Sequence, residues 1–240
     1  TRGNIEGAET GAYSSSPYRY FKYVDDYGET SKAALLTIGW GRDSRDNPLA
    51  PTRGRYQRFS GEISVPAFDL RYYRASYQLT QYLPLSKNWT MGLNLQLGYG
   101  DTYGNKDYPF FKNFYAGGIG SVRGYESSSL GPRDRGNEDN LGGDRQMVFS
   151  AELLTPLPGA DKTLRGLVFF DAGAVWGYEP VGESSYKRQK LDFSDLRYSW
   201  GFGVAWISPL GPLKFSLAFP INKKEGDKTE RFQFQIGTGF

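Results

Sequence analysis

Residues 89–100 read Trp-Thr-Met-Gly-Leu-Asn-Leu-Gln-Leu-Gly-Tyr-Gly, with an apolar side chain at every second position from Met91 to Tyr99. Side chains of a β-strand point alternately to opposite faces, so one face of this segment is apolar and the other carries small or polar residues. Such a strand has lipid or a packed core on one side and a polar environment on the other.

The same alternation recurs along the chain and predicts about nine strands. Most are roughly ten residues long, which is the length that crosses a bilayer at a tilt. Alternation is clearest in 89–100, 197–208, 212–219 and in the last ten residues, and it is weaker elsewhere. The remaining segments are 32–43, 55–65, 71–83, 145–155 and 164–176.

Composition excludes several kinds of chemistry. The 240 residues include no cysteine and no histidine, so disulfides, thiol nucleophiles, Ser/His/Asp triads and Cys/His zinc sites are impossible. We therefore expect no enzyme activity, no metal and no cofactor. A net charge of +3 without a block of basic residues does not indicate nucleic-acid binding. No apolar run approaches the ~18 residues of a transmembrane helix.

Glycine (31 residues) and aromatic residues (16%) are abundant, although the apolar total is only 38%. A soluble β-sandwich or lipocalin-like barrel would also alternate, but its outer face is usually charged, whereas the polar faces here are dominated by Gly, Ser, Gln and Asn. We therefore predict an all-β fold, a transmembrane antiparallel β-barrel of outer-membrane type.

The connections alternate between short and long, as in outer-membrane barrels. On this pattern the C-terminus lies on the short-turn side, the periplasm. Two connections break the rule, because 44–53 is long on the short side and 66–70 is short on the long side. The short turns are 84–88, 157–163 and 209–211, and the long loops are 102–143, 177–196 and 221–230.

The segment 102–143 is too long for a passive connection. Its glycine-rich centre, Gly117 to Tyr125, lacks the Gly-Lys-Ser/Thr of a phosphate-binding loop, so it is either a plain turn or a turn that presents Arg123. Alternation places Glu152, Phe169 and Asp171 on the lumen face, where a carboxylate needs a partner. Arg123 could bridge the two carboxylates and stack on Phe169. A glycosidase-like carboxylate pair is the alternative.

Several motifs, in this order and spacing, resemble the C-terminal part of the barrel of the BamA family, the outer-membrane protein insertases of Gram-negative bacteria. The resemblance covers nearly the whole chain. The motifs are Asn113 to Gly118, Ser121 to Tyr125, Leu130 to Pro132, Phe170 to Gly173 with Val175 and Trp176, Ser208 to Leu213, and Phe232 to Gly237.

The resemblance implies the roles of individual residues. The long loop would fold into the barrel, and Arg123 of the motif Val122-Arg123-Gly124-Tyr125 would contact Glu152 and Asp171. The last strand would pair imperfectly with the first barrel strand and form a lateral gate, with a kink at Gly237. The gate and terminal-strand residues are Phe232, Phe234, Ile236, Gly237 and Phe240.

The resemblance also implies partners and location. The substrates would be unfolded outer-membrane proteins that carry a C-terminal strand signal. Other partners would be accessory lipoproteins, bound mainly through POTRA domains absent from this sequence, and outer-membrane lipids. The site would be the bacterial outer membrane, with a periplasmic C-terminus.

A family barrel has sixteen strands, so residues 1–240 would be the C-terminal part of one outer-membrane β-barrel domain, with strands eight to sixteen. Residues 1–31 would be the remnant of an extracellular loop, and 102–143 the lumen-inserted loop. A secretion transporter of the same superfamily, which shares the Arg-Gly loop motif, is the alternative function. A passive porin or a lipid enzyme fits less well, because the lumen holds a loop and the chain lacks a nucleophile with its base.

Overall fold

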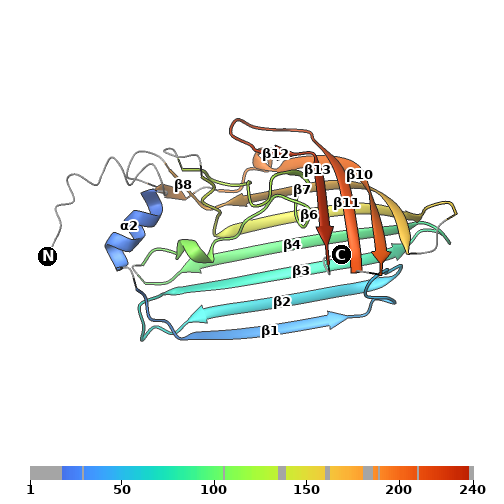
Figure 1. Ribbon diagram of the computed structural model, residues 1–240. Coiled ribbons are helices and arrows are strands. Elements are labelled where there is room, and N and C mark those ends of the chain that lie inside the picture. The colour runs from blue at the N-terminus through green and yellow to red at the C-terminus, as the bar shows by residue number, and fades with distance from the viewer. Residues whose placement is uncertain are drawn as a thin grey trace.

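Nine antiparallel strands form one curved sheet in the computed structural model (Figure 1). Each coincides with one of the predicted segments, so the strand count and the fold class are confirmed. Adjacent strands pair in the order β1 (Leu35–Asp43), β2 (Gly54–Ser64), β3 (Tyr72–Pro84), β4 (Thr90–Thr102), β6 (Arg145–Pro156), β7 (Leu164–Trp176), β10 (Arg197–Ser208), β11 (Gly211–Pro220) and β13 (Phe232–Ile236).

The structure describes most of the chain. The described residues are 18–28, 30–104, 106–134, 139–159, 163–180, 186–188, 190–209 and 211–237.

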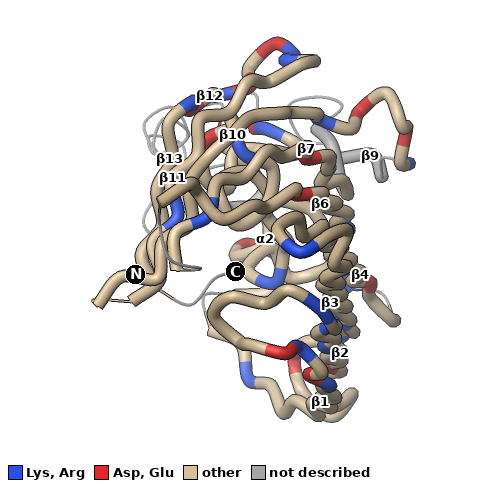
Figure 2. The backbone as a smooth tube through the Cα atoms, turned by 90° about the vertical axis from the view of Figure 1, so that its right-hand side faces the viewer, with Lys and Arg blue, Asp and Glu red and all other residues tan. Residues whose placement is uncertain are grey.

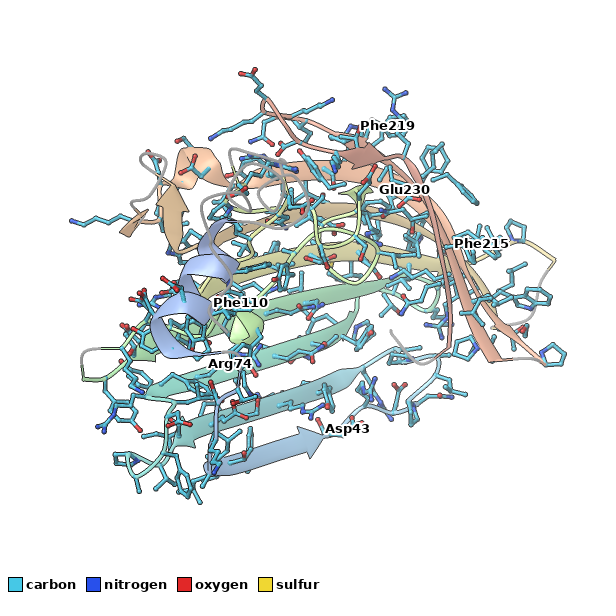
Figure 3. All side chains as sticks on the ribbon, turned by 60° about the vertical axis from the view of Figure 1, so that its left-hand side comes forward. Asp43, Arg74, Phe110, Phe215, Phe219 and Glu230 are labelled. Carbon is cyan, nitrogen blue, oxygen red and sulfur yellow. The ribbon has the colours of Figure 1, made fainter. Side chains whose placement is uncertain are left out.

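The two faces of the sheet have opposite chemistry, and the apolar face is the exposed one. On β10, Trp200 and Phe202 are 48% and 49% exposed, whereas Ser199 is fully buried. Phe215 and Phe219 of β11 likewise point away from the hollow side (Figure 3), while Ser216 between them is buried. A soluble β-domain buries its apolar face, so this pattern is that of a membrane barrel.

The sheet curls around a hollow side without closing (Figure 2). Among the described residues, β1 pairs only with β2 and β13 only with β11. Both outer strands therefore carry a row of main-chain groups without a strand partner in the described part of the chain.

The long connections gather at one end of the strands and contain short elements that the alternation pattern did not predict (Figure 1). These elements are α2 (Tyr18–Tyr27), η2 (Phe110–Lys112), β5 (Gly124–Tyr125), β8 (Tyr178–Pro180), β9 (Tyr186–Arg188), η3 (Phe193–Asp195) and β12 (Thr229–Glu230).

Helix α2 lies within the predicted loop remnant 1–31, of which residues 1–17 and 29 lie outside the described part. Its aromatic-rich sequence favours strand over helix, so tertiary contacts explain the helix. The ring of Tyr20 stacks on Phe110 with centroids 4.1 Å apart, and the Tyr27 hydroxyl accepts a 2.9 Å hydrogen bond from the Asp107 amide. No helix in the described residues is long and apolar enough to cross a membrane.

The main core lies between the hollow face of the sheet and the segment 102–143. One buried cluster joins Val122 and Tyr125 of the loop to Val148 of β6 and Val175 of β7. The long loop therefore packs inside the curl of the sheet, where it covers β6 and β7.

Candidate functional site

The glycine-rich motif Val122-Arg123-Gly124-Tyr125 is the most deeply buried part of the long loop. Val122 and Tyr125 are fully buried, and Arg123 is 2% exposed. Its last two residues form β5, which pairs with β12 of the segment 221–230. The motif is therefore held from two directions, by the sheet beneath it and by the neighbouring loop.

Arg123 and Asp171 form a bidentate ion pair. The Nε and Nη2 atoms of Arg123 lie 2.7 Å from Oδ2 and Oδ1 of Asp171, respectively. The main-chain amide of Arg123 also donates to Oδ2, over 3.0 Å. Asp171 lies on β7 and is completely buried, so both the guanidinium fork and the backbone of Arg123 are fixed to the wall.

A second carboxylate and a second cation complete the cluster. Arg123 Nη1 lies 2.5 Å from Glu152 Oε1 on β6, and Lys214 Nζ on β11 lies 2.7 Å from the same oxygen. Ser150 Oγ accepts from Arg123 over 3.0 Å and donates to Asp171 over 2.6 Å. Two cations thus balance two carboxylates, and the network joins the loop to three strands.

The aromatic ring of Phe169 packs against the guanidinium group of Arg123. The Cζ atom of Arg123 lies 3.5 Å from the centroid of the Phe169 ring, which is a cation–π contact in a desolvated position. Phe169 belongs to β7, two residues before Asp171, and alternation places both on the same face. The structure thus brings together Arg123 and all three of its predicted lumen neighbours.

The network is costly to break, because removing one partner of a buried ion pair leaves an uncompensated charge and costs about 3–5 kcal/mol. Glu152 is engaged by both cations and Asp171 by Arg123, with Ser150 as its further partner. This arrangement favours an anchor over an acid–base pair that flanks a substrate.

The terminal-strand residues lie apart from this cluster. Phe232, Phe234 and Ile236 face outward and are 58–67% exposed. Gly237 follows the end of β13 with a φ of +105°, a value that L side chains rarely adopt, and its amide donates to the Pro212 carbonyl over 2.9 Å. Of the predicted strand 231–240, β13 thus covers Phe232–Ile236 and ends before Gly237, and Phe240 lies outside the described residues.

Sequence reasoning missed Lys214, Ser150 and Gln233 as members of the site region. All three lie at positions that the alternation pattern assigns to the lumen face, and this pattern is the sequence signal that could have identified them. Alternation gives the face of a side chain but not its partner across the curl, so the contact of Lys214 with Glu152 depends on the sheet's curvature.

The long turn 44–53 also reaches the lumen, which explains its unusual length. Arg165 of β7 donates to the carbonyls of Pro51 and Ala50 over 2.9 and 2.8 Å. A cavity of about 510 Å³ lies between this turn at Pro48 and Leu49 and the loop tip at Ile119 to Arg123.

Asp46 orders that turn from within. Its carboxylate accepts hydrogen bonds from the amides of Thr52 and Arg53, over 2.9 and 3.2 Å, and from the Thr52 hydroxyl. Burial alone would raise the pKa of Asp46, but these hydrogen bonds outweigh it and lower the pKa to about 2. The turn 44–53 is therefore an ordered element that its own hydrogen bonds hold in place.

Comparison with known families identifies the same kind of barrel. The model of the Omp85 superfamily domain matches residues 6–240. The chain is similar to the outer membrane protein assembly factor BamA of Neisseria meningitidis serogroup B, with 42% identity over 95% of this chain and 32% of that protein. It also resembles the mouse sorting and assembly machinery component 50 homolog, with 27% identity over 82% of this chain and 44% of that protein.

A solved structure gives the same result. The crystal structure of BamA from Haemophilus ducreyi lacking POTRA domains 1–3 matches with a TM-score of 0.78 and 31% identity, over 91% of this chain and 47% of that chain. The chain thus spans about a third of the Neisseria relative and about half of the solved barrel protein.

Arg123→Glu is expected to release the long loop, because it places a third carboxylate beside Glu152 and Asp171 in a buried site. Limited trypsin digestion of the membrane-embedded protein should cleave within residues 102–143 much faster than in the wild type. The matched control is Glu126→Gln, a charge removal at an exposed position of the same loop that creates no new trypsin site. Equal cleavage rates for the two variants would contradict the anchor.

Tyr125→Phe is expected to leave the stability unchanged within ~0.5 kcal/mol. The Tyr125 hydroxyl is buried and has no hydrogen-bond partner among the described residues, so its removal takes away no contact and relieves desolvation. Urea unfolding in lipid measures this. A loss of 1–2 kcal/mol, roughly one hydrogen bond, would show that the hydroxyl is satisfied in the membrane.

Proposed function

This chain belongs to the Omp85 superfamily, and from that premise we propose that it is the C-terminal part of an outer-membrane insertase. In this role it folds and inserts β-barrel proteins into the bacterial outer membrane through a lateral gate at its terminal strand. The names of its relatives support the proposal, since both BamA and the component 50 homologs are assembly proteins by name.

The observation that carries the proposal is the state of the terminal strand. β13 contains five residues, against ten in β11 and twelve in β10. Its ladder with β11 covers five residue pairs, whereas the ladder between β10 and β11 covers ten. A strand held by so short a ladder is readily displaced or extended by an incoming strand, which would pair with main-chain N–H and C=O groups as in β-augmentation.

The proposed activity involves no covalent step. In the hydrocarbon region unpaired main-chain groups are costly, so a nascent hairpin inserts more easily if one edge is already hydrogen-bonded. The apolar outer face of a short terminal strand spans less of the bilayer than the faces of its neighbours. This mismatch favours local thinning of the bilayer. Both effects lower the barrier to insertion.

The topology supports a periplasmic C-terminus. β13 runs antiparallel to β11, so its end returns toward the turn after β10, where Gly237 meets Pro212. Short turns of outer-membrane barrels face the periplasm. The proposed partners are unfolded outer-membrane proteins with a C-terminal strand signal, accessory lipoproteins bound through domains beyond this chain, and outer-membrane lipids.

Reconstitution of the intact protein in liposomes tests the proposal. A urea-unfolded eight-stranded outer-membrane protein should fold into these vesicles several-fold faster than into protein-free vesicles, as measured by its heat-modifiable gel mobility. Equal rates would refute the insertase. Accumulation of an unfolded soluble polypeptide inside the vesicles would instead favour the secretion transporter.

Gly237→Val is expected to slow substrate folding, because a β-branched residue disfavours a φ of +105° and holds the end of the terminal strand extended. The matched control is Gly226→Val, which removes a glycine with a φ of +80° at the loop end of the sheet. If both variants assemble substrate at the wild-type rate, Gly237 has no part in gating.

A further inference from the structure

The terminal strand is bonded directly to the loop motif by one side chain. Gln233 of β13 is 5% exposed, and its Nε2 donates to the Tyr125 carbonyl over 2.7 Å. Its Oε1 accepts a longer hydrogen bond, 3.4 Å, from the Gly124 amide. One amide thus satisfies a main-chain acceptor and a main-chain donor of β5, and only a side chain with both functions can do so.

The motif can come this close to the terminal strand because of Gly124. Its φ is +88°, and a Cβ at this position would lie 3.2 Å from both the Ala218 Cβ and the Pro220 Cδ of β11. Any larger residue would push the motif away from β11 and β13. The approach that Gln233 bridges is therefore built into the motif itself.

The segment that leads into the terminal strand is held by the same motif. Thr229 and Glu230 of β12 pair with Tyr125 and Gly124, and the Glu126 amide donates to the Lys228 carbonyl over 3.0 Å. Figure 3 labels Glu230, the last residue of this pairing. Gln233 follows three residues later, so it extends the attachment from the loop onto the barrel strand.

Few other contacts fix this strand. Its ladder to β11 covers Phe232–Ile236, flanked by one bond from the Ala218 amide to the Arg231 carbonyl and one from the Gly237 amide to the Pro212 carbonyl. Phe232 and Phe234 face outward and are more than half exposed. Gln233 therefore attaches the strand to the loop motif in addition to its ladder with β11.

We propose that Gln233 is a positioning residue that couples the Arg123-anchored loop to the terminal strand, so that the two move as one unit. The ion pairs of Arg123 fix the motif to β6 and β7, and the Gln233 amide fixes β13 to the motif. A change in the loop is thereby transmitted to the strand edge. The use of this coupling in gating rests on the proposed insertase function, but the coupling itself does not.

Hydrogen–deuterium exchange of the intact protein in lipid nanodiscs tests the coupling. Gln233→Leu removes both hydrogen bonds to the motif, together with a 3.3 Å bond from Gln233 Nε2 to Glu230 Oε2. It should raise the exchange rate of the Phe232–Ile236 amides on the order of tenfold, while β6 and β7 keep their protection. Gln233→Glu, which retains the shape but not the donor, should do the same. The matched control is Gln235→Leu, two residues later on the same face and opposite Lys214, and it should have a much smaller effect.

A double-mutant cycle then identifies the route of coupling. Releasing the loop with Arg123→Glu, or more mildly with Asp171→Asn, should raise terminal-strand exchange when Gln233 is present and add little when it is Leu. Equal effects of loop release in both backgrounds would overturn the proposal, because coupling would then run through β11 and Lys214. Wild-type exchange in Gln233→Leu would overturn it as well.

The same samples separate this inference from the proposed function. If the wild-type protein does not accelerate substrate folding but the exchange cycle behaves as expected, the insertase proposal fails and the coupling stands. If folding is accelerated and the cycle is additive, the coupling fails and the insertase stands.

Discussion

The buried ion pair between Arg123 and Asp171 is the interaction on which the rest of the structure depends. A cation and a carboxylate without solvent are tolerated only when each is almost fully satisfied, and here Ser150, Glu152 and Lys214 supply the remaining bonds. This requirement fixes the long loop inside the curl of the sheet. The loop in turn covers the polar face that the apolar strands leave on the inside.

That polar face follows from the environment of the outer face. The outer face contacts lipid and therefore carries apolar side chains. The alternate residues, on the inner face, are small or polar and cannot form a hydrophobic core. The interior is therefore held by hydrogen bonds and ion pairs with defined geometry. Because these networks join elements far apart in the sequence, as Gln233 of β13 joins the Tyr125 carbonyl of the loop, the interior can transmit a change from the loop to the terminal strand.

The fold was predictable because its signal is local. A period of two appears in segments such as 89–100 and needs no knowledge of the partner strand, and all nine strands were found within a few residues of their observed ends. The alternation of side chains along each strand also placed Glu152, Phe169 and Asp171 on the inner face. Helix α2 was not predictable, because the stacking of Tyr20 on Phe110 overrides the strand preference of its sequence. The bond from Gln233 to Tyr125 depends on the curl of the sheet and on Gly124, which no alternation pattern encodes.

The most direct test of this account is a double-mutant cycle on the anchor itself, with Arg123→Gln and Asp171→Asn, measured as the free energy of unfolding in lipid. Each single variant leaves a buried charge without its partner, whereas the double variant leaves neither. We expect a coupling energy of roughly 3 kcal/mol, with the double variant far more stable than the sum of the single losses implies. Single losses that add to within ~0.5 kcal/mol would contradict it.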